Sequence, residues 1–367
     1  MNTIQEELRN KIQLPSWRAI STFKLGMKSA LPTLLAALVA VQSHAADAEA
    51  AKTNDNPSPA AAGSNPIFRD AFTADPSTLV VGDTLYCYVG HDKAVGRQFF
   101  TMPDWLCYST RDMKNWTPHG AIMKATDFKY GTRNSAWAAQ VIEKGGKYYF
   151  YVTLTRTNSS EHCISVAVAD SPLGPFVDAR GTPLITDGMT TDSRRPNADI
   201  DPTVFIDDDG TPWLAWGNGD CYLVKLKPNM IEPDGAIKKL DITPYYSEGP
   251  WLYKRGKLYY NVFAVDVPGT QPEQIGYATA PAVEGPWTYH GLVTGRAKVG
   301  FTIHPAVVEF KGLWYFFYHD GSSSLNGQTG GDCRRSVCVE YLNYNPDGTI
   351  KPITQTAEGV SASPGVP

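Results

Sequence analysis

Short apolar runs rich in Tyr, Val and Trp, each ended by Gly, Pro or Asp, dominate the hydrophobic pattern from about residue 65 onward. Apolar residues at helical spacing are scarce. Runs of about four to eight residues of this kind, bounded by turn residues, are typical of β-strands. The pattern therefore predicts an all-β protein.

One unit of this pattern recurs along the chain. In each copy a turn glycine precedes an aromatic strand, at residues 85–88, 148–151, 213–216, 258–260 and 314–318. A third strand follows it, at residues 106–109, 164–168, 222–225, 275–278 and 337–341, and outer segments carry Trp116, Phe176 and Trp287. Four short antiparallel strands repeated five times predict a five-bladed β-propeller. The alternative, a β-sandwich, would not repeat these internal landmarks.

Each copy also has a strand before its turn glycine, and a distinctive residue stands near the start of that strand. These residues are Asp75, Trp137 or Gln140, Asp201, Glu248 and His304. Pro or Gly-Pro follows the four ionisable ones, from which we expect an extended backbone at these positions. The innermost strands of a propeller line its central channel. We therefore expect the three carboxyls to meet at one mouth of that channel.

The N-terminal segment has a different pattern. Residues 30–41 form an apolar core with Arg18, Lys24 and Lys28 ahead of it and small residues behind it, which indicates a signal peptide over residues 1–45. A start at Met27 would give a more typical signal, and a short buried helix is the alternative. The composition of residues 46–64 predicts a disordered linker. We expect the catalytic propeller to span residues 65–355 and a C-terminal tail to span residues 356–367.

Charge and cysteine content narrow the class further. The formal net charge of -4 leaves no basic surface for nucleic acid. No Cys follows the apolar core, so we expect no lipid or membrane anchor, and export to the periplasm or the medium. The six cysteines would meet an oxidising compartment. Most of them lie in apolar strand patterns, and a domain of this size does not depend on disulfides, so we expect buried free thiols.

The three carboxyls suggest a reaction. Asp207, Asp208 and Asp209 precede Gly210 and are interpreted as a hairpin turn, whereas Asp201 has apolar neighbours, where a charge is costly without a purpose. Carboxyls that share a cleft repel one another, so that one stays protonated while another stays ionised. Cleavage of a glycosidic bond needs such an acid and such a base. Trp and Tyr would offer stacking faces for sugar rings.

Several ordered motifs carry a resemblance to a known family. They are Asn65-Pro66-Ile67 with Ala74-Asp75-Pro76, Ala136–Ile142, Asp199–Phe205, Trp216-Gly217-Asn218, Ser247–Trp251, Thr302–Pro305 and Arg334–Val337. Over about residues 65–350 the chain resembles glycoside hydrolase family 43. This resemblance implies a five-bladed propeller and an inverting, single-displacement hydrolysis. It also implies that Asp75 is the general base, that Glu248 is the general acid, and that Asp201 tunes and orients the acid.

The resemblance implies further roles at the channel mouth. Arg335 would reach the bound sugar, whereas Arg334 is interpreted as a surface residue. His304 would contact sugar or approach a structural Ca²⁺ held largely by water, with a neutral core histidine as the alternative. Trp137 would line the pocket or pack in the core, and Asn218 would bind sugar or form a turn. Phe99 and Phe100 would form the rim. Where the family usually has proline this chain has Ala139, which leaves the placing of Trp137 open.

The leading interpretation is an exported α-L-arabinofuranosidase that removes arabinose side chains from plant arabinan or arabinoxylan. A β-xylosidase is the first alternative, because both sugars present similar hydroxyl groups, and an endo-arabinanase is the second. An endo-arabinanase needs an open groove, whereas the extra loop at residues 96–105 indicates a closed pocket. A carbohydrate-binding propeller without catalysis is the alternative outside enzymes, but it would not need three carboxyls at the starts of its strands.

Overall fold

The computed structural model describes residues 60–269 and 272–364. The predicted signal peptide and most of the predicted linker therefore lie outside the described residues. Strands make up most of the regular structure of these residues, and the two helices found among them, η1 (Ala125–Asp127) and η2 (Asp187–Met189), are single 3-10 turns. Within the described part of the chain, no helix has the length and apolar character needed to cross a membrane.

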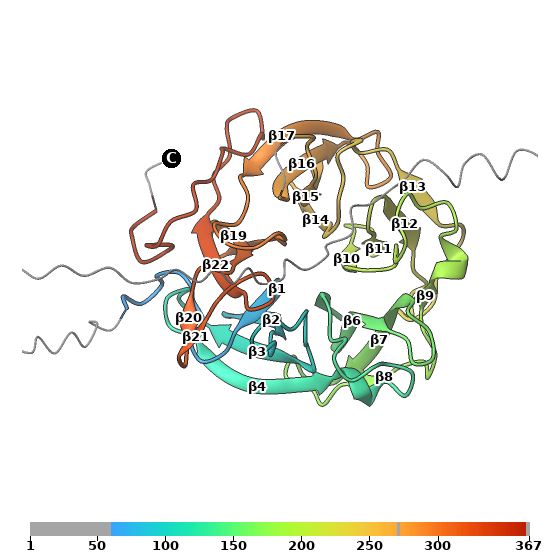
Figure 1. Cartoon of the computed structure of the whole chain (residues 1–367). Helices are drawn as coiled ribbons and strands as arrows, with labels where there is room; N and C mark the ends of the chain where they lie inside the picture. Colours follow the sequence, from blue (N-terminus) through green and yellow to red (C-terminus); the bar gives the residue numbers. More distant parts are fainter. Residues whose placement is uncertain (1–59, 270–271, 365–367) are drawn as a thin grey trace, which may run out of the picture. The chain divides into compact units, whose positions relative to one another are not determined.

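Five antiparallel sheets are arranged around a common centre, as the predicted propeller requires (Figure 1). Blade one contains β1 (Thr73–Val81), β2 (Thr84–His91), β3 (Asp104–Thr110) and β4 (Thr117–Lys124). Blade two contains β5 (Ala139–Lys144), β6 (Lys147–Thr155), β7 (His162–Ala169), β8 (Val177–Asp178) and β9 (Ile185–Thr186). Blade three contains β10 (Thr203–Ile206), β11 (Pro212–Trp216), β12 (Cys221–Lys225) and β13 (Lys238–Leu240).

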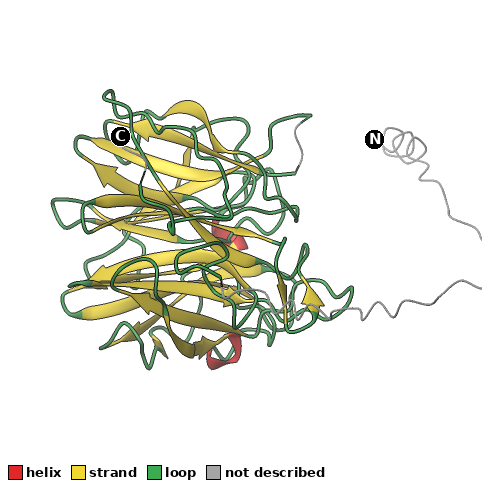
Figure 2. Cartoon of the chain, turned by 90° about the vertical axis from the view of Figure 1, so that its left-hand side faces the viewer, coloured by secondary structure: helices red, strands yellow, loops and turns green. Residues whose placement is uncertain are grey.

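Blade four contains β14 (Trp251–Arg255), β15 (Leu258–Val265), β16 (Gln274–Ala280) and β17 (Thr288–Thr294). Blade five contains β18 (Ala306–Phe310), β19 (Leu313–Asp320) and β22 (Ser336–Tyr341). A small hairpin of β20 (Ser324–Leu325) and β21 (Gln328–Thr329) lies in the chain between β19 and β22. The strands of the blades are seen from the side in Figure 2.

The N-terminal segment completes blade five, whose sheet has three strands of its own. Ile67 N–H donates to Val337 O at 2.9 Å, and Thr73 N–H donates to Arg335 O at 2.8 Å. The Asn65 side chain accepts from Val339 N–H at 2.8 Å. Residues 65–73 thus run beside β22 before the chain enters β1, and this contact closes the ring between the last blade and the first.

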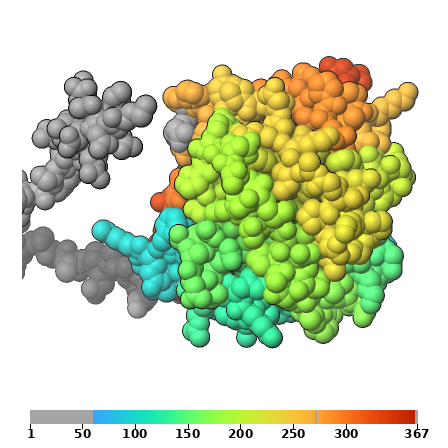
Figure 3. Space-filling model, turned by 90° about the vertical axis from the view of Figure 1, so that its right-hand side faces the viewer, coloured from blue at the N-terminus to red at the C-terminus, as the bar shows by residue number. Residues whose placement is uncertain are grey.

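Each apolar core cluster lies between adjacent blades. Ala74 and Val141 share one cluster, Val166 and Val204 a second, and Leu223 and Phe263 a third. The largest cluster joins blades four, five and one. Figure 3 shows the outer side of blades two to four as a continuous surface. Because side chains fill the spaces between sheets, the innermost strands are held in fixed positions around the centre.

All six cysteines are free thiols, and all but Cys333 are buried, in agreement with the prediction. The segment interpreted as a C-terminal tail contacts the propeller over part of its length. Thr356 N–H donates to Glu340 Oε1 at 2.7 Å, and Val360 N–H donates to Gly63 O at 2.9 Å.

The expectation of an extended backbone before the prolines is wrong for two of the carboxyls. Asp75 has φ 51° and Asp201 has φ 60°, in the left-handed region, and Gly249 beside Glu248 has φ 63°. Non-glycine residues rarely occupy this region, and they do so where the surrounding structure holds them. In blade one the strand pairing shifts between Ala74 and Ser77, so Asp75 lies at a bulge in β1. The bulge and the turns re-aim the carboxyls at the central mouth.

Candidate active site

A cavity of about 270 Å³ opens at one mouth of the central channel. Every blade contributes one of the residues that the repeats predict at the strand starts: Asp75, Trp137, Asp201, Glu248 and His304. The other predicted site residues, Phe100, Asn218 and Arg335, also line the cavity. The structure therefore brings these eight predicted residues together, with Phe99 of the predicted rim beside them, although they come from widely separated parts of the chain.

Asp75 is held by a buried arginine. Nη1 of Arg335 donates to Asp75 Oδ1 at 3.1 Å, while Nε and Nη2 donate to the two carboxylate oxygens of Asp92 at 2.9 and 3.0 Å. The Asp75 N–H also donates to His319 Nδ1 at 3.2 Å. Arg335 and Asp92 are fully enclosed by protein, with exposed side-chain fractions of 5% and 0%. This bidentate pair fixes the guanidinium against the Asp75 carboxylate.

These neighbours keep Asp75 ionised. Burial alone would raise the pKa of Asp75, but the Arg335 guanidinium, together with the adjacent His319, outweighs it and holds the pKa well below its usual range. An ionised carboxylate that faces a cavity is able to accept a proton from water. Asp75 thus has the protonation state that a general base requires.

Glu248 is in the opposite electrostatic state. Burial raises the pKa of Glu248 to about 7, the negative charge of Asp75 adds to this effect, and the positive charges of Arg195 and Arg335 oppose it. The Glu248 carboxyl makes no hydrogen bond to another side chain or backbone group among the described residues, so its oxygens are free to meet a substrate. A protonated carboxyl in such a cavity is able to act as a general acid.

Asp201 links the third blade to the loop that carries Glu248. Its N–H donates to Thr153 Oγ1 at 2.9 Å, and its Oδ2 accepts from the Gly249 N–H at 3.0 Å. Burial raises the pKa of Asp201 well above its usual value, and the charges of Glu248 and Asp75 act in the same direction. The pKa of Asp201 therefore depends on the charges of the other two carboxyls, and its hydrogen bond to Gly249 anchors the turn beside Glu248.

Aromatic rings form one wall of the cavity. Phe100 lies edge-on to Trp137 with ring centroids 5.9 Å apart, and the Arg335 guanidinium lies over the Phe100 ring at 4.5 Å. Trp137 is held by a hydrogen bond from Nε1 to Thr155 Oγ1 at 3.0 Å. It is thus fixed in the pocket wall although Ala139 stands where the family usually has proline. Trp137 also packs against the core cluster between blades one and two, so both interpretations of this residue apply.

Asn218 belongs to a polar network that reaches the loop carrying Glu248. Nη1 of Arg195 donates to Asn218 Oδ1 and to Ser247 Oγ, both at 3.1 Å. Nη2 of Arg195 donates to Asp266, whose carboxylate also accepts from Ser247 Oγ. Ser247 immediately precedes Glu248. Arg195 therefore connects a side chain of the pocket wall to the backbone that carries the candidate acid.

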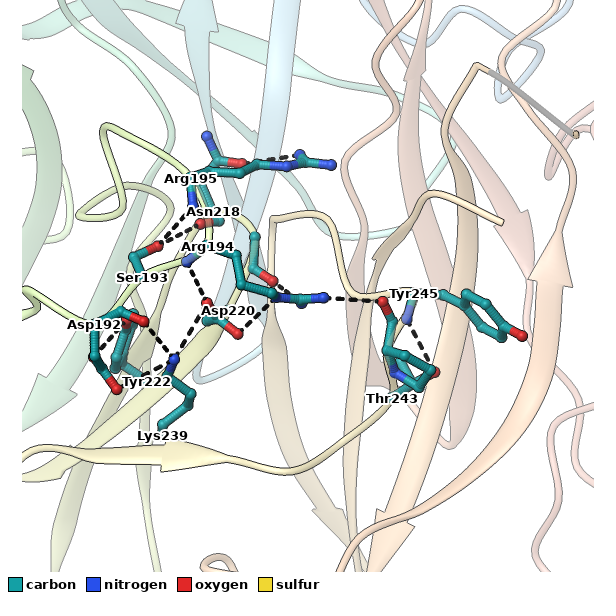
Figure 4. A network of polar contacts seen from close by, with 12 residues as sticks. Asp192, Ser193, Arg194, Arg195, Asn218, Asp220, Tyr222, Lys239, Thr243 and Tyr245 are labelled. Atoms are coloured by element: carbon teal, nitrogen blue, oxygen red, sulfur yellow. Dashed lines mark hydrogen bonds and ion pairs between the residues drawn. The ribbon is translucent and has the colours of Figure 1, made fainter. Parts of the chain in front are cut away.

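The adjacent Arg194 takes part in a different set of contacts (Figure 4). Its Nε donates to Asp220 Oδ1 at 2.9 Å, and its Nη1 and Nη2 donate to the carbonyls of Pro244 and Gly219. Lys239 lies 3.4 Å from the same Asp220 carboxylate. Arg194 thus stabilises the loops behind the pocket wall without lining the cavity itself.

His304 is the residue predicted to approach a calcium ion. Burial lowers the pKa of His304 to about 4, so the ring is neutral, and its Nδ1 lies 3.9 Å from Asp201 Oδ2. No group of three His, Cys, Asp or Glu side chains suited to a metal occurs among residues 60–269 and 272–364. Because Ca²⁺ prefers six to eight oxygen ligands, these residues do not form a directly ligated calcium site. An ion held mainly by water remains a prediction.

Sequence reasoning missed Asp92, Arg195, Asp266 and His319. Three of these share a signal within the repeats, because Asp92, Asp266 and His319 stand at or just after the ends of β2, β15 and β19. Antiparallel pairing places the end of a second strand beside the start of the innermost strand, as in the pairing of His91 with Thr73. Polar residues at these ends therefore lie at the same mouth. Arg195 lies in an irregular loop and has no such signal.

The region of this chain that is similar to known proteins contains the motifs named in the sequence analysis. Residues 64–350 match the family described as Glycosyl hydrolases family 43. The arabinoxylan arabinofuranohydrolase of Bacillus subtilis (strain 168) is 31% identical over 342 residues, which cover 81% of this chain and 65% of the relative. A xylosidase/arabinosidase of Bacteroides ovatus is 30% identical, over 76% of this chain and 94% of the relative. The chain spans only 52% of a similar arabinoxylan arabinofuranohydrolase from Paenibacillus polymyxa.

A solved structure agrees with the fold. It is a family 43 β-xylosidase/α-arabinofuranosidase from a compost microbial metagenome, in complex with xylotriose and described as a calcium-free form. Its TM-score is 0.69 at 27% identity, and the match covers 80% of this chain and 98% of that chain. The match to the family extends over most of the propeller and includes all three carboxyls of the cavity. This chain belongs to family 43 of the glycosyl hydrolases.

Proposed function

We propose that this protein is an exported, inverting α-L-arabinofuranosidase that removes arabinose side chains from plant arabinan or arabinoxylan. The observation that carries the proposal is the opposite protonation of two carboxyls in one cavity. The pKa of Asp75 lies well below its usual range, whereas burial raises the pKa of Glu248 to about 7. Family membership supports the glycosidase reaction, and the relatives' names support the substrate class.

The roles proposed for the carboxyls follow from their surroundings. Asp75, ionised beside Arg335, accepts a proton from water as the water attacks the anomeric carbon. Glu248, protonated, donates its proton to the leaving oxygen. Asp201 holds the Gly249 N–H and thereby orients the turn that carries the acid. The water and the leaving group lie on opposite faces of the sugar, so the configuration at the anomeric carbon inverts.

The size of the cavity supports removal of a single sugar. Ligand pockets of about 300–1,000 Å³ hold drug-sized molecules, so a cavity of about 270 Å³ suits one pentose ring. A β-xylosidase is the alternative within the same reaction, because several relatives are named as xylosidase/arabinosidase. An endo-arabinanase, which must bind an internal part of a chain, fits a cavity of this size less well.

Hydrolysis of paired substrates by two variants tests the proposal. The wild type should hydrolyse arabinofuranosides faster than xylosides. Glu248→Gln should lose about 10²–10⁴-fold in kcat/KM on an unactivated arabinofuranoside, and less on the nitrophenyl glycoside, whose leaving group needs little protonation. Asp75→Asn should lose a similar factor on both substrates, because attack of the water is part of the single displacement whichever group leaves.

Three results would contradict these assignments. Near-full activity of Glu248→Gln on the unactivated glycoside would exclude it as the acid. NMR that shows the sugar released with its anomeric configuration retained would exclude the inverting mechanism. Calorimetry that shows oligosaccharide binding by a wild type without turnover would favour a carbohydrate-binding propeller.

A further inference from the structure

A second hollow adjoins the catalytic cavity on the side of blades one and five. It has a volume of about 500 Å³ and is lined by Gly96, Arg97, Gln98, Phe99, Phe301, Gly331, Asp332, Cys333 and Arg334. Phe99 and Phe301 line both this groove and the catalytic cavity. The two spaces therefore adjoin across a shared aromatic wall, and we name the second one the rim groove.

The two aromatic side chains of the shared wall are more exposed to solvent than is usual for large apolar residues. Phe99 is 68% exposed and Phe301 is 42% exposed, whereas most large apolar side chains of the protein are buried. Phe99 packs edge-on against Phe100 at 4.8 Å, and Phe301 lies 5.8 Å from the same ring. Exposed apolar groups that gather at the mouth of a cavity mark a binding surface. Their flat faces suit the apolar C–H faces of sugar rings.

The segment that carries Phe99 is held in place. Arg334 donates from Nη1 to the carbonyls of Ala94 and Gly96 at 3.4 and 2.9 Å, and from Nε to Thr329 O at 2.6 Å. It thus ties blade five to the loop of blade one, although the sequence suggested only a surface arginine. A groove wall that is fixed before binding loses less entropy when a ligand arrives.

Polar groups border the aromatic wall. Neither Arg97 nor Asp332 forms a hydrogen bond or an ion pair with another described residue, and both are exposed on the groove. Sugar hydroxyls both donate and accept hydrogen bonds, so a cationic donor and an anionic acceptor are each able to serve them. The third charged residue of the groove, Arg334, already donates to backbone carbonyls, so the charges left to meet a ligand, those of Arg97 and Asp332, are opposite and balance.

We propose that the rim groove binds the leaving-group part of the substrate, namely one or more neutral main-chain pentose residues, while the terminal sugar occupies the catalytic cavity. This inference rests on the proposed function and deepens it. A cavity that suits one ring leaves the rest of the substrate at its mouth. The rim groove adjoins that mouth at Phe99 and Phe301 and offers stacking faces and hydrogen-bond partners to a neutral chain.

The test compares two substrates that carry the same terminal sugar. One is a methyl glycoside, whose leaving group is too small to fill the groove, and the other is an arabinoxylo-oligosaccharide. In Phe301→Ala the ratio of kcat/KM for the oligosaccharide to kcat/KM for the methyl glycoside should fall about tenfold, the loss expected for one aromatic stacking contact. Arg97→Ala, which lies outside the catalytic cavity, should lower the same ratio about threefold, as expected for one hydrogen bond.

Leu313→Ala is the matched control. Leu313 is an exposed apolar residue (39%) at the start of β19, and the site lies at the other end of this strand, at His319 and Asp320. Its substitution should leave the ratio unchanged. Ratios that stay at the wild-type value in both groove variants would overturn the proposal.

Failure of the proposed function would be distinguishable. A wild type that hydrolyses neither substrate refutes that function. Calorimetry then tests, without any hydrolysis, whether the rim groove binds xylotriose. Weaker binding of xylotriose by Phe301→Ala and Arg97→Ala than by Leu313→Ala would support the rim groove. Equal binding by all three variants would overturn it.

Discussion

At the scale of single residues, neighbouring charges decide what each carboxyl is able to do. Asp75 and Glu248 are both enclosed by protein, and burial raises the pKa of each. Only Asp75 has a guanidinium bonded to it, through Arg335. Its net shift is therefore downward, while that of Glu248 is upward. The same chemical group is thus able to serve as a base at one position and as an acid at the other, at the same pH.

This difference predicts the pH profile of kcat/KM. Activity should persist on the acid side to below about pH 4, where an ordinary carboxyl takes up a proton, because the pKa of Asp75 is lowered. It should fall as the pH rises through about 7, where Glu248 loses its proton. In Arg195→Gln the falling limb should move to higher pH, because the positive charge that lowers the pKa of Glu248 is gone.

Arg194→Gln is the control for this prediction. Arg194 has a comparable set of hydrogen bonds, but they go to Asp220 and to the carbonyls of Pro244 and Gly219 (Figure 4). Its falling limb should coincide with that of the wild type. Two results would show that Arg195 does not lower the pKa of Glu248. One is a falling limb of the kcat/KM profile at the same pH in both arginine variants, and the other is a falling limb at lower pH in Arg195→Gln.

At the scale of the elements, one bulge and two turns near the starts of the innermost strands aim the chemistry. The left-handed backbone lies at Asp75 inside β1, at Asp201 before β10 and at Gly249 before β14. At Gly249 a side chain is also excluded by its neighbour, since a Cβ atom there would lie 3.0 Å from His304 Nδ1. The catalytic turn of blade four and the histidine of blade five therefore constrain each other.

Gly249→Ala should consequently lower kcat/KM by more than about tenfold, because small displacements of catalytic groups are costly. Gly256→Ala separates backbone strain from this contact. Gly256 has φ 60°, close to the 63° of Gly249, but no atom lies within 4 Å of the position of its added Cβ. Both variants should lose about 1–2 kcal/mol of unfolding free energy, measured by denaturant titration. Only Gly249→Ala should lose activity, and equal activity in the two variants would contradict the argument.

At the scale of the whole propeller, closure of the ring supports the site. The first blade supplies Asp75 and Asp92, and the last supplies Arg335 and His319, so the proposed base is held across the joint between them. Asn65 fastens the same joint. Its Nδ2 lies within 3.2 Å of Val339 O, Glu340 Oε1 and Thr356 O, and its Oδ1 accepts from Val339 N–H.

Asn65→Ala should therefore lower the free energy of unfolding by about 1–3 kcal/mol, since it leaves polar groups of the joint unsatisfied. Denaturant titration measures this loss. Asn134→Ala, at an exposed loop position whose side chain has no hydrogen-bond partner among the described residues, should change it by no more than about 0.5 kcal/mol. Equal stability of the two variants would show that the N-terminal segment does not hold the ring closed.

The local pattern of the sequence determined the number of blades, their strands and the residues at the strand starts. Alternation of apolar residues, turn glycines and their repetition are local properties, so the inner strands of each blade are predictable from their own stretch of chain. The outer edge of blade five is different, because residues 65–73 complete it from the other end of the propeller. Repetition also predicted that Asp75, Asp201 and Glu248 would converge, because equivalent positions of a closed ring face one centre. The structure brings them together in this way.

The tertiary structure alone decided which partner each carboxyl has. The hydrogen bond from Asp75 to His319 spans 244 residues, and that from Arg335 to Asp92 spans 243. Arg195 reaches Ser247 from an irregular loop. Protonation depends on distances of a few ångströms between such groups and on how far water is excluded from them. Neither quantity is encoded in any one segment, so the division of the carboxyls into a proposed base and a proposed acid emerges only when the ring is closed.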